Sequence, residues 1–321
     1  MRAAVTGVAG FIGSRLAASL LDAGHEVLGI DRMSDYYDPA AKEMNLAALR
    51  SSEFTFLPLD LNLMTPTDLA FDLDVVFHLA AQPGVRGSWG EGFATYVRDN
   101  VLATQHLLDC LALLPEPPRV VYSSSSSIYG NAESYPTRTS AVPSPLSPYG
   151  VTKLAGECLV AAYAMGQGVP AVSLRYFTVY GPGQRPDMAI HRIIDAALNN
   201  RSFTVLGDGR QIRDFTFVED VVSANLLAAA MELSPQSHEI FNVAGGTESS
   251  LRDLIAMVGD VVGRQVDVEW LPRMPGDPAK TKGDTVATSR RLGWRPHTPL
   301  RAGIAAQAEW QAKLASYEVA A

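Results

Sequence analysis

A short apolar strand, three glycines and a helix open the chain, and this order limits its possible folds more than any other feature. The strand covers residues 2–6, Gly7, Gly10 and Gly13 follow at intervals of three, and leucines continue at helical spacing from Leu16. The first glycine allows a tight turn, the second lets the backbone approach a pyrophosphate, and the third lets helix and strand pack closely. The helix N-terminus then faces the phosphates. The pattern predicts a phosphate-binding turn, with a purely structural glycine turn as the alternative.

A second strand, residues 25–31, ends in an acid about twenty residues after the glycines. A carboxylate at this position accepts hydrogen bonds from the adenosine ribose hydroxyls and repels a 2′-phosphate. Asp31 therefore predicts NAD as the bound dinucleotide. Arg32, its neighbour, leaves NADP open, because an arginine there can accommodate the extra phosphate.

Short apolar strands then alternate with helical patterns. We expect buried strands over residues 54–60 and 74–80, and further strands over 119–124 and 171–177, with helices over 93–114 and 147–168. This alternation predicts an α/β fold with a doubly wound parallel (Rossmann) sheet. Ligands bind such sheets at the carboxyl ends of the strands, where Asp31, Asp60, Ala80, Ser125 and Phe177 lie.

After Tyr180 the regular pattern loosens into a smaller, interrupted region. It contains a loop over 181–187, a short strand over 202–206, a helix that opens with Asp214 and runs to Met231, and one more sheet strand over 239–244. Its tail is rich in proline and glycine. We expect residues 1–177 and 213–245 to form the NAD-binding domain, and residues 178–212 and 246–321 to form a smaller C-terminal substrate domain.

Tyr149 and Lys153 are four residues apart within the helical pattern over 147–168. On a helix this spacing places both side chains on one face. A neighbouring cation and a hydroxyl hydrogen bond both favour a phenolate, so we expect Lys153 and a serine of the run 123–127 to lower the pKa of Tyr149 and make it a base. The alternative is an ordinary amphipathic helix face.

Composition excludes several classes of function. The chain has 321 residues, a net charge of −8 and a pI near 5.3, which argues against a nucleic-acid surface, so local groups must meet any anionic ligand. No run of about 18 apolar residues is present, so we expect no membrane partner and a cytoplasmic protein. Cys110 and Cys158 lie in apolar helical patterns and are predicted to be buried free thiols. The six histidines show no ligand spacing, and we predict no metal.

Three motifs together resemble the extended short-chain dehydrogenase/reductase family of sugar-nucleotide epimerases, dehydratases and decarboxylases. They are the glycine turn, the serine run ending in Ile128-Tyr129-Gly130, and Tyr149-x-x-x-Lys153, and the match spans nearly the whole chain. The resemblance implies that Ser125, Tyr149 and Lys153 are catalytic. It implies NAD contacts at Gly7, Gly10, Phe11, Ile12, Gly13, Asp31, Arg32, Asp60, Leu61, Leu79, Ala80, Ala81, Asn100, Tyr149, Lys153 and Tyr176.

Several positions narrow the subgroup. Ser125 to Ser127 replace the Thr-Asp-Glu of 4,6-dehydratases, Ser127 replaces the glutamate of UDP-glucuronate decarboxylases, and Thr178 replaces the asparagine of galactose-type epimerases. The stretch 175–189 instead resembles the UDP-glucuronate 4-epimerase group. That resemblance implies reversible inversion at C4 through a 4-keto sugar, with NAD tightly bound and recycled. The alternatives are a UDP-glucose or UDP-N-acetylglucosamine 4-epimerase, a UDP-glucuronate decarboxylase, and, more distantly, a non-catalytic NAD-sensing regulator.

The same resemblance implies contacts to a UDP-sugar. They are expected at Arg86, Ser126, Ser127, Thr178, Val179, Arg185, Thr204, Arg213 and Asp277. Arg185 is expected to bind the sugar carboxylate in two places, because its planar fork matches a carboxylate. Met274 stands where many relatives have arginine, and Arg273 is expected to replace that diphosphate contact. The helices over 93–114 and 147–168 resemble those of the family's dimer interface, which implies a homodimer.

Overall fold

A seven-stranded parallel sheet forms the centre of the computed structural model, which describes residues 1–69, 72–234, 236–272 and 276–320. The spatial order of its strands is β10-β6-β5-β4-β1-β2-β3. The strands are β1 (Arg2–Thr6), β2 (Glu26–Ile30), β3 (Phe54–Leu57), β4 (Val75–His78), β5 (Arg119–Ser125), β6 (Ala171–Tyr176) and β10 (His238–Val243). This confirms the predicted doubly wound sheet.

The strand order reverses at β1. The chain proceeds from β1 to β2 and β3 on one side, and then returns to place β4, β5 and β6 on the other. Connections therefore diverge beyond the carboxyl ends of β1 and β4, which leaves a crevice where ligands bind in such sheets. Gly7 follows β1 and Leu79 follows β4, so the glycine turn lies at this point.

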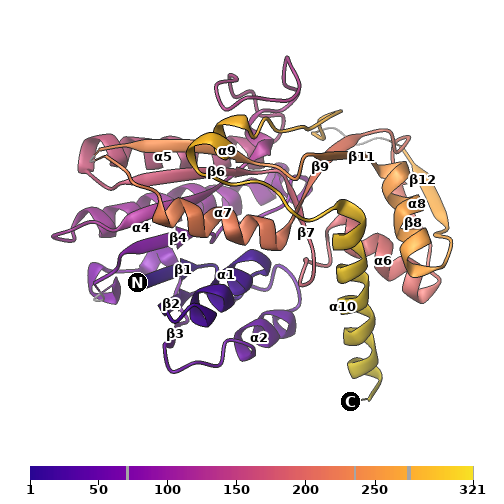
Figure 1. The fold of residues 1–321 in the computed structure, drawn as a ribbon, viewed down its shortest axis with the longest axis horizontal. Helices are drawn as coiled ribbons and strands as arrows, with labels where there is room; N and C mark the ends of the chain where they lie inside the picture. Colours follow the sequence, from indigo (N-terminus) through magenta and orange to yellow (C-terminus); the bar gives the residue numbers. More distant parts are fainter. Residues whose placement is uncertain (70–71, 235, 273–275, 321) are drawn as a thin grey trace.

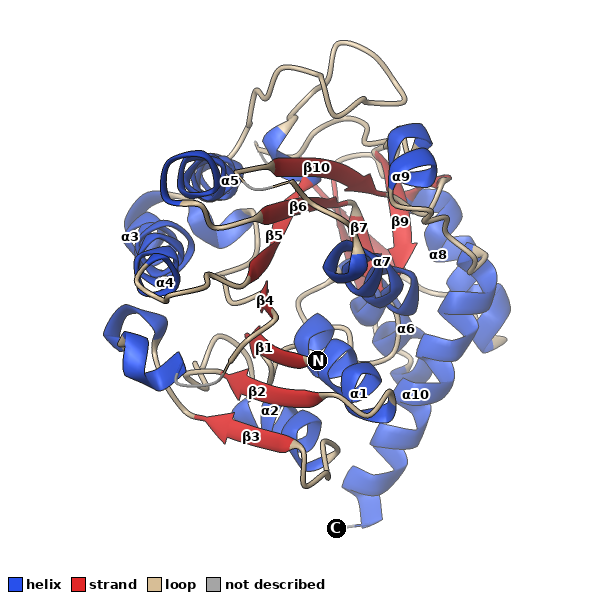
Figure 2. Cartoon of the chain, turned by 60° about the vertical axis from the view of Figure 1, so that its left-hand side comes forward, coloured by secondary structure: helices blue, strands red, loops and turns tan. Residues whose placement is uncertain are grey.

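Helices cover both faces of the sheet (Figures 1 and 2). One apolar core joins the sheet to α1, α2 and α7, and a second joins it to α4 and α5. Tight burial of β1 on both faces explains its continuous apolar sequence. The helices around this sheet are α1 (Phe11–Asp22), α2 (Pro39–Ala47), α3 (Phe93–Val97), α4 (Ala103–Ala112), α5 (Pro148–Gln167), α7 (Val218–Ala230) and α9 (Val286–Arg291).

Two elements of the central region differ from their predictions. Strand β3 is only half-buried rather than buried, because it forms the edge of the sheet. The helix expected over 93–114 is interrupted: a π-helical segment, Arg98–Leu102, separates α3 from α4. Single π turns often occur at functional sites. Here the segment carries the buried residues Asp99 and Asn100. Short 3₁₀ segments lie at Leu61–Leu63, Pro66–Leu69, Arg86–Ser88, Gly90–Gly92 and Ser126–Ile128.

The remaining elements pack around a separate apolar core beside the strand ends. They are β7 (Thr178–Tyr180), β8 (Phe203–Leu206), β9 (Ile212–Phe217), β11 (Thr247–Ser250), β12 (Val268–Leu271), α6 (Ala189–Asn199), α8 (Leu251–Val262) and α10 (Leu300–Ala320). Strands β11, β9 and β7 form one small sheet, and β12 and β8 form another. The helix predicted to open at Asp214 was placed too early: Asp214 lies in β9, and its carboxylate accepts the N–H groups of Gly246 and Gly283. No helix among the described residues is long and apolar enough to cross a membrane.

Candidate active site

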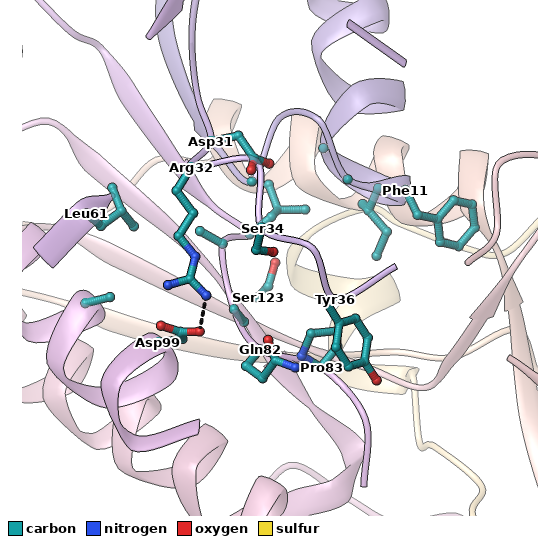
Figure 3. A pocket seen from close by; sticks show the side chains of 18 of the residues that line it. Phe11, Asp31, Arg32, Ser34, Tyr36, Leu61, Gln82, Pro83, Asp99 and Ser123 are labelled. Atoms are coloured by element: carbon teal, nitrogen blue, oxygen red, sulfur yellow. Dashed lines mark hydrogen bonds and ion pairs between the residues drawn. The ribbon is translucent and has the colours of Figure 1, made fainter. Parts of the chain in front are cut away.

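One pocket lies beyond the carboxyl ends of β1, β2 and β4 and continues to the start of α5. It brings together segments that are far apart in the sequence (Figure 3). Of the residues predicted to contact NAD, it is lined by Gly7, Gly10, Phe11, Ile12, Gly13, Asp31, Arg32, Asp60, Leu61, Leu79, Ala80, Ala81, Tyr149, Lys153 and Tyr176. Asn100 does not line it. Its side chain lies behind the pocket wall and binds the backbone N–H and C=O of Gln82 at 2.6 and 3.0 Å.

The glycine turn leaves no room for side chains. Gly7 has φ of 71°, a left-handed conformation that favours glycine, and a Cβ there would lie 2.9 Å from the backbone N of Ala80. A Cβ on Gly13 would lie 2.2 Å from the carbonyl oxygen of Gly7. Helix α1 starts directly behind Gly10, without a side-chain cap, so its first N–H groups face the pocket. These residues fit a dinucleotide whose pyrophosphate binds the helix N-terminus.

We expect Gly13→Ala to weaken dinucleotide binding by about fivefold or more, because overpacking of this kind costs on the order of 1–3 kcal/mol. The added Cβ must push the carbonyl of Gly7 away and thereby deform the turn. Gly166→Ala is the matched control, since nothing lies within 4 Å of a Cβ at that helical position. The measurement is the amount of dinucleotide that each purified variant retains. Equal retention by both variants would contradict the assignment.

Asp31 keeps its carboxylate at the pocket wall through two backbone N–H donors. Ala9 N donates to one oxygen at 3.2 Å, and Met33 N donates to the other at 2.8 Å. Arg32 lies next to it but points elsewhere: its guanidinium donates to Asp99 at 2.6 Å (Figure 3) and also to Asp60 at 3.2 Å. The two carboxylates thus bind the guanidinium of Arg32, the residue that had left NADP possible as the cofactor.

The pocket also contains residues that the motifs did not identify. They are Ile30, Ser34, Tyr36, Tyr37, Lys42, Leu59, Asn62, Gln82, Pro83, Asp99 and Ala103. Ser123 and Ser124 of the serine run line the pocket as well. Lys42, on α2, is only 5% exposed, donates to the carbonyl and hydroxyl oxygens of Ser34 at 2.8 and 3.0 Å, and has its pKa lowered by burial. A lysine in the polar helical stretch 39–47 gives no sign of burial.

The helix that carries Tyr149 and Lys153 has strong local start and stop signals. Ser147 caps it by accepting the N–H of Gly150 at 3.1 Å, Pro148 occupies the first turn, and Gly168 ends it with φ of 72°. This confirms the expected helix over 147–168. Its second residue and its second turn thereby bring the phenol and the amine to the same pocket.

Burial dominates the ionisation of this pair. Burial raises the pKa of the Tyr149 phenol, whereas a hydrogen bond with Ser125 and the charge of Arg185 lower it. The predicted serine contact is present, but the predicted net lowering is wrong for the folded chain, because desolvation is the largest effect. Burial also lowers the pKa of Lys153 to about 7, against the attraction of Glu157. The cation that favours the Tyr149 phenolate is therefore Arg185, which the sequence assigned only to the substrate.

The buried amine of Lys153 should make the protein less stable at neutral pH. Burying the Lys153 ammonium lowers the free energy of unfolding, and this cost is at its full size below pH 7. The cost disappears as the pH rises from 7 towards the unfolded pKa of 10.5, because the amine is then neutral in the folded protein. We therefore expect Lys153→Met to raise the melting temperature of the NAD-free protein by about 2–4 °C at pH 7 and by less at pH 9. Thermal unfolding at both pH values measures this. A destabilised variant, or a gain that grows with pH, would contradict the burial cost.

Arg185 lies within the pocket wall rather than facing solvent. Its side chain is 17% exposed, and Nε and Nη2 each donate to a different oxygen of Asp187 at 2.9 Å. The guanidinium lies 5.8 Å from the ring centre of Tyr36. Asp187 thus orients Arg185 through one edge of its fork, with the Tyr36 ring nearby.

The other predicted substrate residues do not line this pocket. Ser126 and Ser127 lie beyond β5 next to Ser125, and Thr178 and Val179 are in β7. Thr204 is in β8 and hydrogen-bonds Glu269 at 3.4 Å, and Arg213 lies 3.9 Å from Asp277. Arg86 is exposed on a 3₁₀ turn. The predicted diphosphate contact at Arg273, beside Met274, lies outside the described residues.

The comparisons with known proteins agree with this geometry. The model of the NAD-dependent epimerase/dehydratase family matches residues 3–244. The chain is 34% identical over 311 residues to a UDP-glucuronate 4-epimerase of Thermodesulfobacterium geofontis, covering 95% of this chain and 94% of that protein. It is 38% identical over 309 residues to YtcB of Bacillus subtilis, named an uncharacterized UDP-glucose epimerase, covering 95% and 96%.

A solved structure is similar along the whole chain. The crystal structure of UDP-glucuronic acid 4-epimerase from Bacillus cereus, in complex with UDP-glucuronic acid and NAD, superposes with a TM-score of 0.94. The two sequences are 38% identical, and the match covers 98% of this chain and 100% of that one.

Proposed function

Since this chain belongs to the NAD-dependent epimerase/dehydratase family, we propose that it is a UDP-glucuronate 4-epimerase that interconverts UDP-glucuronic acid and UDP-galacturonic acid. The observation that carries the proposal is the joint position of Tyr149, Lys153 and Arg185 at one pocket. A phenol base would serve any of the sugar-nucleotide 4-epimerases named as alternatives above. The inward-facing arginine beside it suits a substrate that bears a carboxylate.

NAD is the cofactor, and bound NAD would supply reversible hydride transfer at the sugar carbon. The residues of the chain transfer the proton and bind the sugar. Tyr149, as phenolate, removes the proton of the C4 hydroxyl, and Ser125 and Tyr149 then hydrogen-bond the oxygen of the 4-keto sugar. The ketone must expose its opposite face before reduction, after which Tyr149 returns the proton to O4. In the substrate-free chain, the charge of Arg185 favours the phenolate against the effect of burial.

The test is incubation of the purified protein with UDP-glucuronate and no added cofactor. We expect UDP-galacturonate by NMR, because bound NAD is regenerated in each turnover. Unchanged sugar would favour an NAD-sensing regulator, and a pentose product would favour a decarboxylase. A parallel panel of UDP-glucose and UDP-N-acetylglucosamine distinguishes the other epimerases. Denatured protein should release NAD or NADH, and recovery of mainly NADP would overturn the cofactor assignment.

The remaining predicted substrate residues belong to this proposal as well. Strand β7 follows directly after β6, the first strand after the helix that carries Tyr149. Strand β9 pairs with β7, so Thr178 and Arg213 lie on adjacent strands of the small sheet. These positions support a UDP-sugar site formed mainly by residues 178–212 and 246–321. Strand β9 bridges the proposed regions, because it belongs to the range 213–245 yet pairs with β7 and β11.

A homodimer in the cytoplasm completes the proposal. Large apolar side chains are exposed on the segments carrying Leu102, Val151 and Met165, at 50%, 47% and 61%. Cys158 on α5 is also exposed, because its side chain faces outward from the helix. The prediction that both cysteines are buried is therefore wrong for Cys158, whereas Cys110 is buried. A face of this kind supports self-association. Light scattering measures the mass, and a monomer would contradict the proposal.

A further inference from the structure

Arg32 lines the proposed NAD site, yet its charge is taken up by two carboxylates from distant segments. We propose that Asp99, together with Asp60, determines the preference for NAD over NADP by holding the Arg32 guanidinium, which would otherwise be available to a 2′-phosphate. This inference rests on the proposed function only in that a dinucleotide binds this pocket. It assigns a specificity role to a π-helical residue outside the glycine turn and the β2 acid.

Four charged side chains form the network that holds Arg32. Arg32 donates from Nη2 to Asp99 at 2.6 Å and from Nη1 to Asp60 at 3.2 Å. Arg98 donates from Nε to the other oxygen of Asp99 at 2.8 Å and lies 3.7 Å from Asp60. Each aspartate therefore lies between two arginines, and the terminal nitrogens of Arg32 both have carboxylate partners. Charge-assisted bonds of this length are among the stronger hydrogen bonds in proteins.

The burial of Asp99 makes this arrangement costly to open. The side chain of Asp99 is 8% exposed and that of Arg32 is 25% exposed. Withdrawing Arg32 towards a phosphate would leave the Asp99 carboxylate with Arg98 as its guanidinium partner among the contacts described. A buried charge that loses a partner is strongly disfavoured. Moving Arg32 away from Asp99 and Asp60 therefore costs free energy, and the guanidinium stays paired with these two carboxylates.

Asp31 stays outside this network. Its two oxygens accept backbone N–H groups of Ala9 and Met33, so its negative charge is not paired with Arg32. Figure 3 shows the Arg32 side chain extending from the strand end to Asp99. A 2′-phosphate would therefore meet an acid and no available arginine, although the sequence places both residues together.

The experiment compares the dinucleotides that the full-length protein selects. Purified protein is incubated with equimolar NAD and NADP, desalted and denatured, and the released nucleotides are quantified. We expect Asp99→Asn to raise the NADP-to-NAD ratio about tenfold, because one charge-assisted bond to a phosphate is worth roughly that factor. Asp260→Asn is the matched control: it removes the same charge from an exposed position on α8 and should leave the ratio unchanged.

Two further variants decide the origin of the change. Adding Arg32→Ala to Asp99→Asn should cancel the gain, since the released guanidinium is then absent. Arg32→Ala alone should leave the wild-type ratio within about twofold, and it tests the proposal even if Asp99→Asn does not fold. The proposal is overturned if Asp99→Asn folds without a gain, or if Arg32→Ala alone removes NADP that the wild type carries. Retention of neither dinucleotide by the wild type would overturn the proposed function as well.

Discussion

Tyr149→Phe is expected to lower the turnover of UDP-glucuronate by on the order of 10²–10⁴-fold while NAD remains bound. The substitution keeps the ring that packs edge-to-face against Tyr96, with ring centres 6.2 Å apart, and removes only the ionisable oxygen. The hydrogen bond with Ser125 and the favourable charge of Arg185 are lost with it. No other side chain described at this pocket is a phenol held by both groups, so the proton of the C4 hydroxyl loses its acceptor.

Tyr163→Phe provides the matched control on the same helix. Tyr163 hydrogen-bonds Asp109 and does not line the pocket, so its loss should leave turnover near the wild-type value. The measurements are the initial rate by NMR and the NAD content of the denatured protein. If Tyr149→Phe turned over at the wild-type rate with full NAD content, the base would have to be another group.

Arg185→Ala should lower kcat/KM for UDP-glucuronate by about 10²-fold or more. The variant removes the cation from a pocket wall where it is mostly buried, and a charge-assisted pair contributes on the order of 1.5–3 kcal/mol. It also leaves Asp187 without the partner that binds both its oxygens, so a second negative charge then faces the substrate carboxylate. Loss of the positive charge further disfavours the Tyr149 phenolate.

The residual turnover of Arg185→Ala should release CO₂ and a 4-keto-pentose. The 4-keto sugar is a β-keto acid, and loss of CO₂ requires the breaking bond to align with the carbonyl π system. An arginine that holds the C6 carboxylate near the plane of the C4 carbonyl keeps the C5–C6 bond out of this alignment. Adding Asp187→Asn to Arg185→Ala separates the repulsion between Asp187 and the substrate carboxylate from the loss of carboxylate binding by Arg185. The double variant should recover part of the loss in KM but should release as much CO₂ as Arg185→Ala alone.

Arg210→Ala is the control for Arg185→Ala, since Arg210 is an 81% exposed arginine in another glycine-containing turn. Product NMR and CO₂ release are the two readouts. An Arg185→Ala variant with unchanged KM and no CO₂ would transfer carboxylate binding to the hydroxyls of Ser127 and Thr178.

Local sequence determined the features that depend on neighbouring residues. The glycine turn follows from the intervals between Gly7, Gly10 and Gly13, because the steric demand of that turn is set within a few residues. The helix with Tyr149 and Lys153 follows from Ser147, its proline and Gly168 for the same reason. The parallel sheet follows from the alternation of apolar strands and helices.

Only the tertiary structure decided how charges in the pocket pair and ionise. The motif predicted a Tyr149 phenol activated by Lys153, but both groups are desolvated, and the helpful cation comes from Arg185 in a loop 36 positions later in the chain. Asp99 binds Arg32 across 67 positions, and β9 replaces the first turn of an expected helix because β7 and β11 supply its partners. The spacing of residues along the chain predicts local geometry, such as a turn or which face of a helix a side chain lies on. Burial and pairing depend on which distant segments exclude water together, and that is decided by the fold.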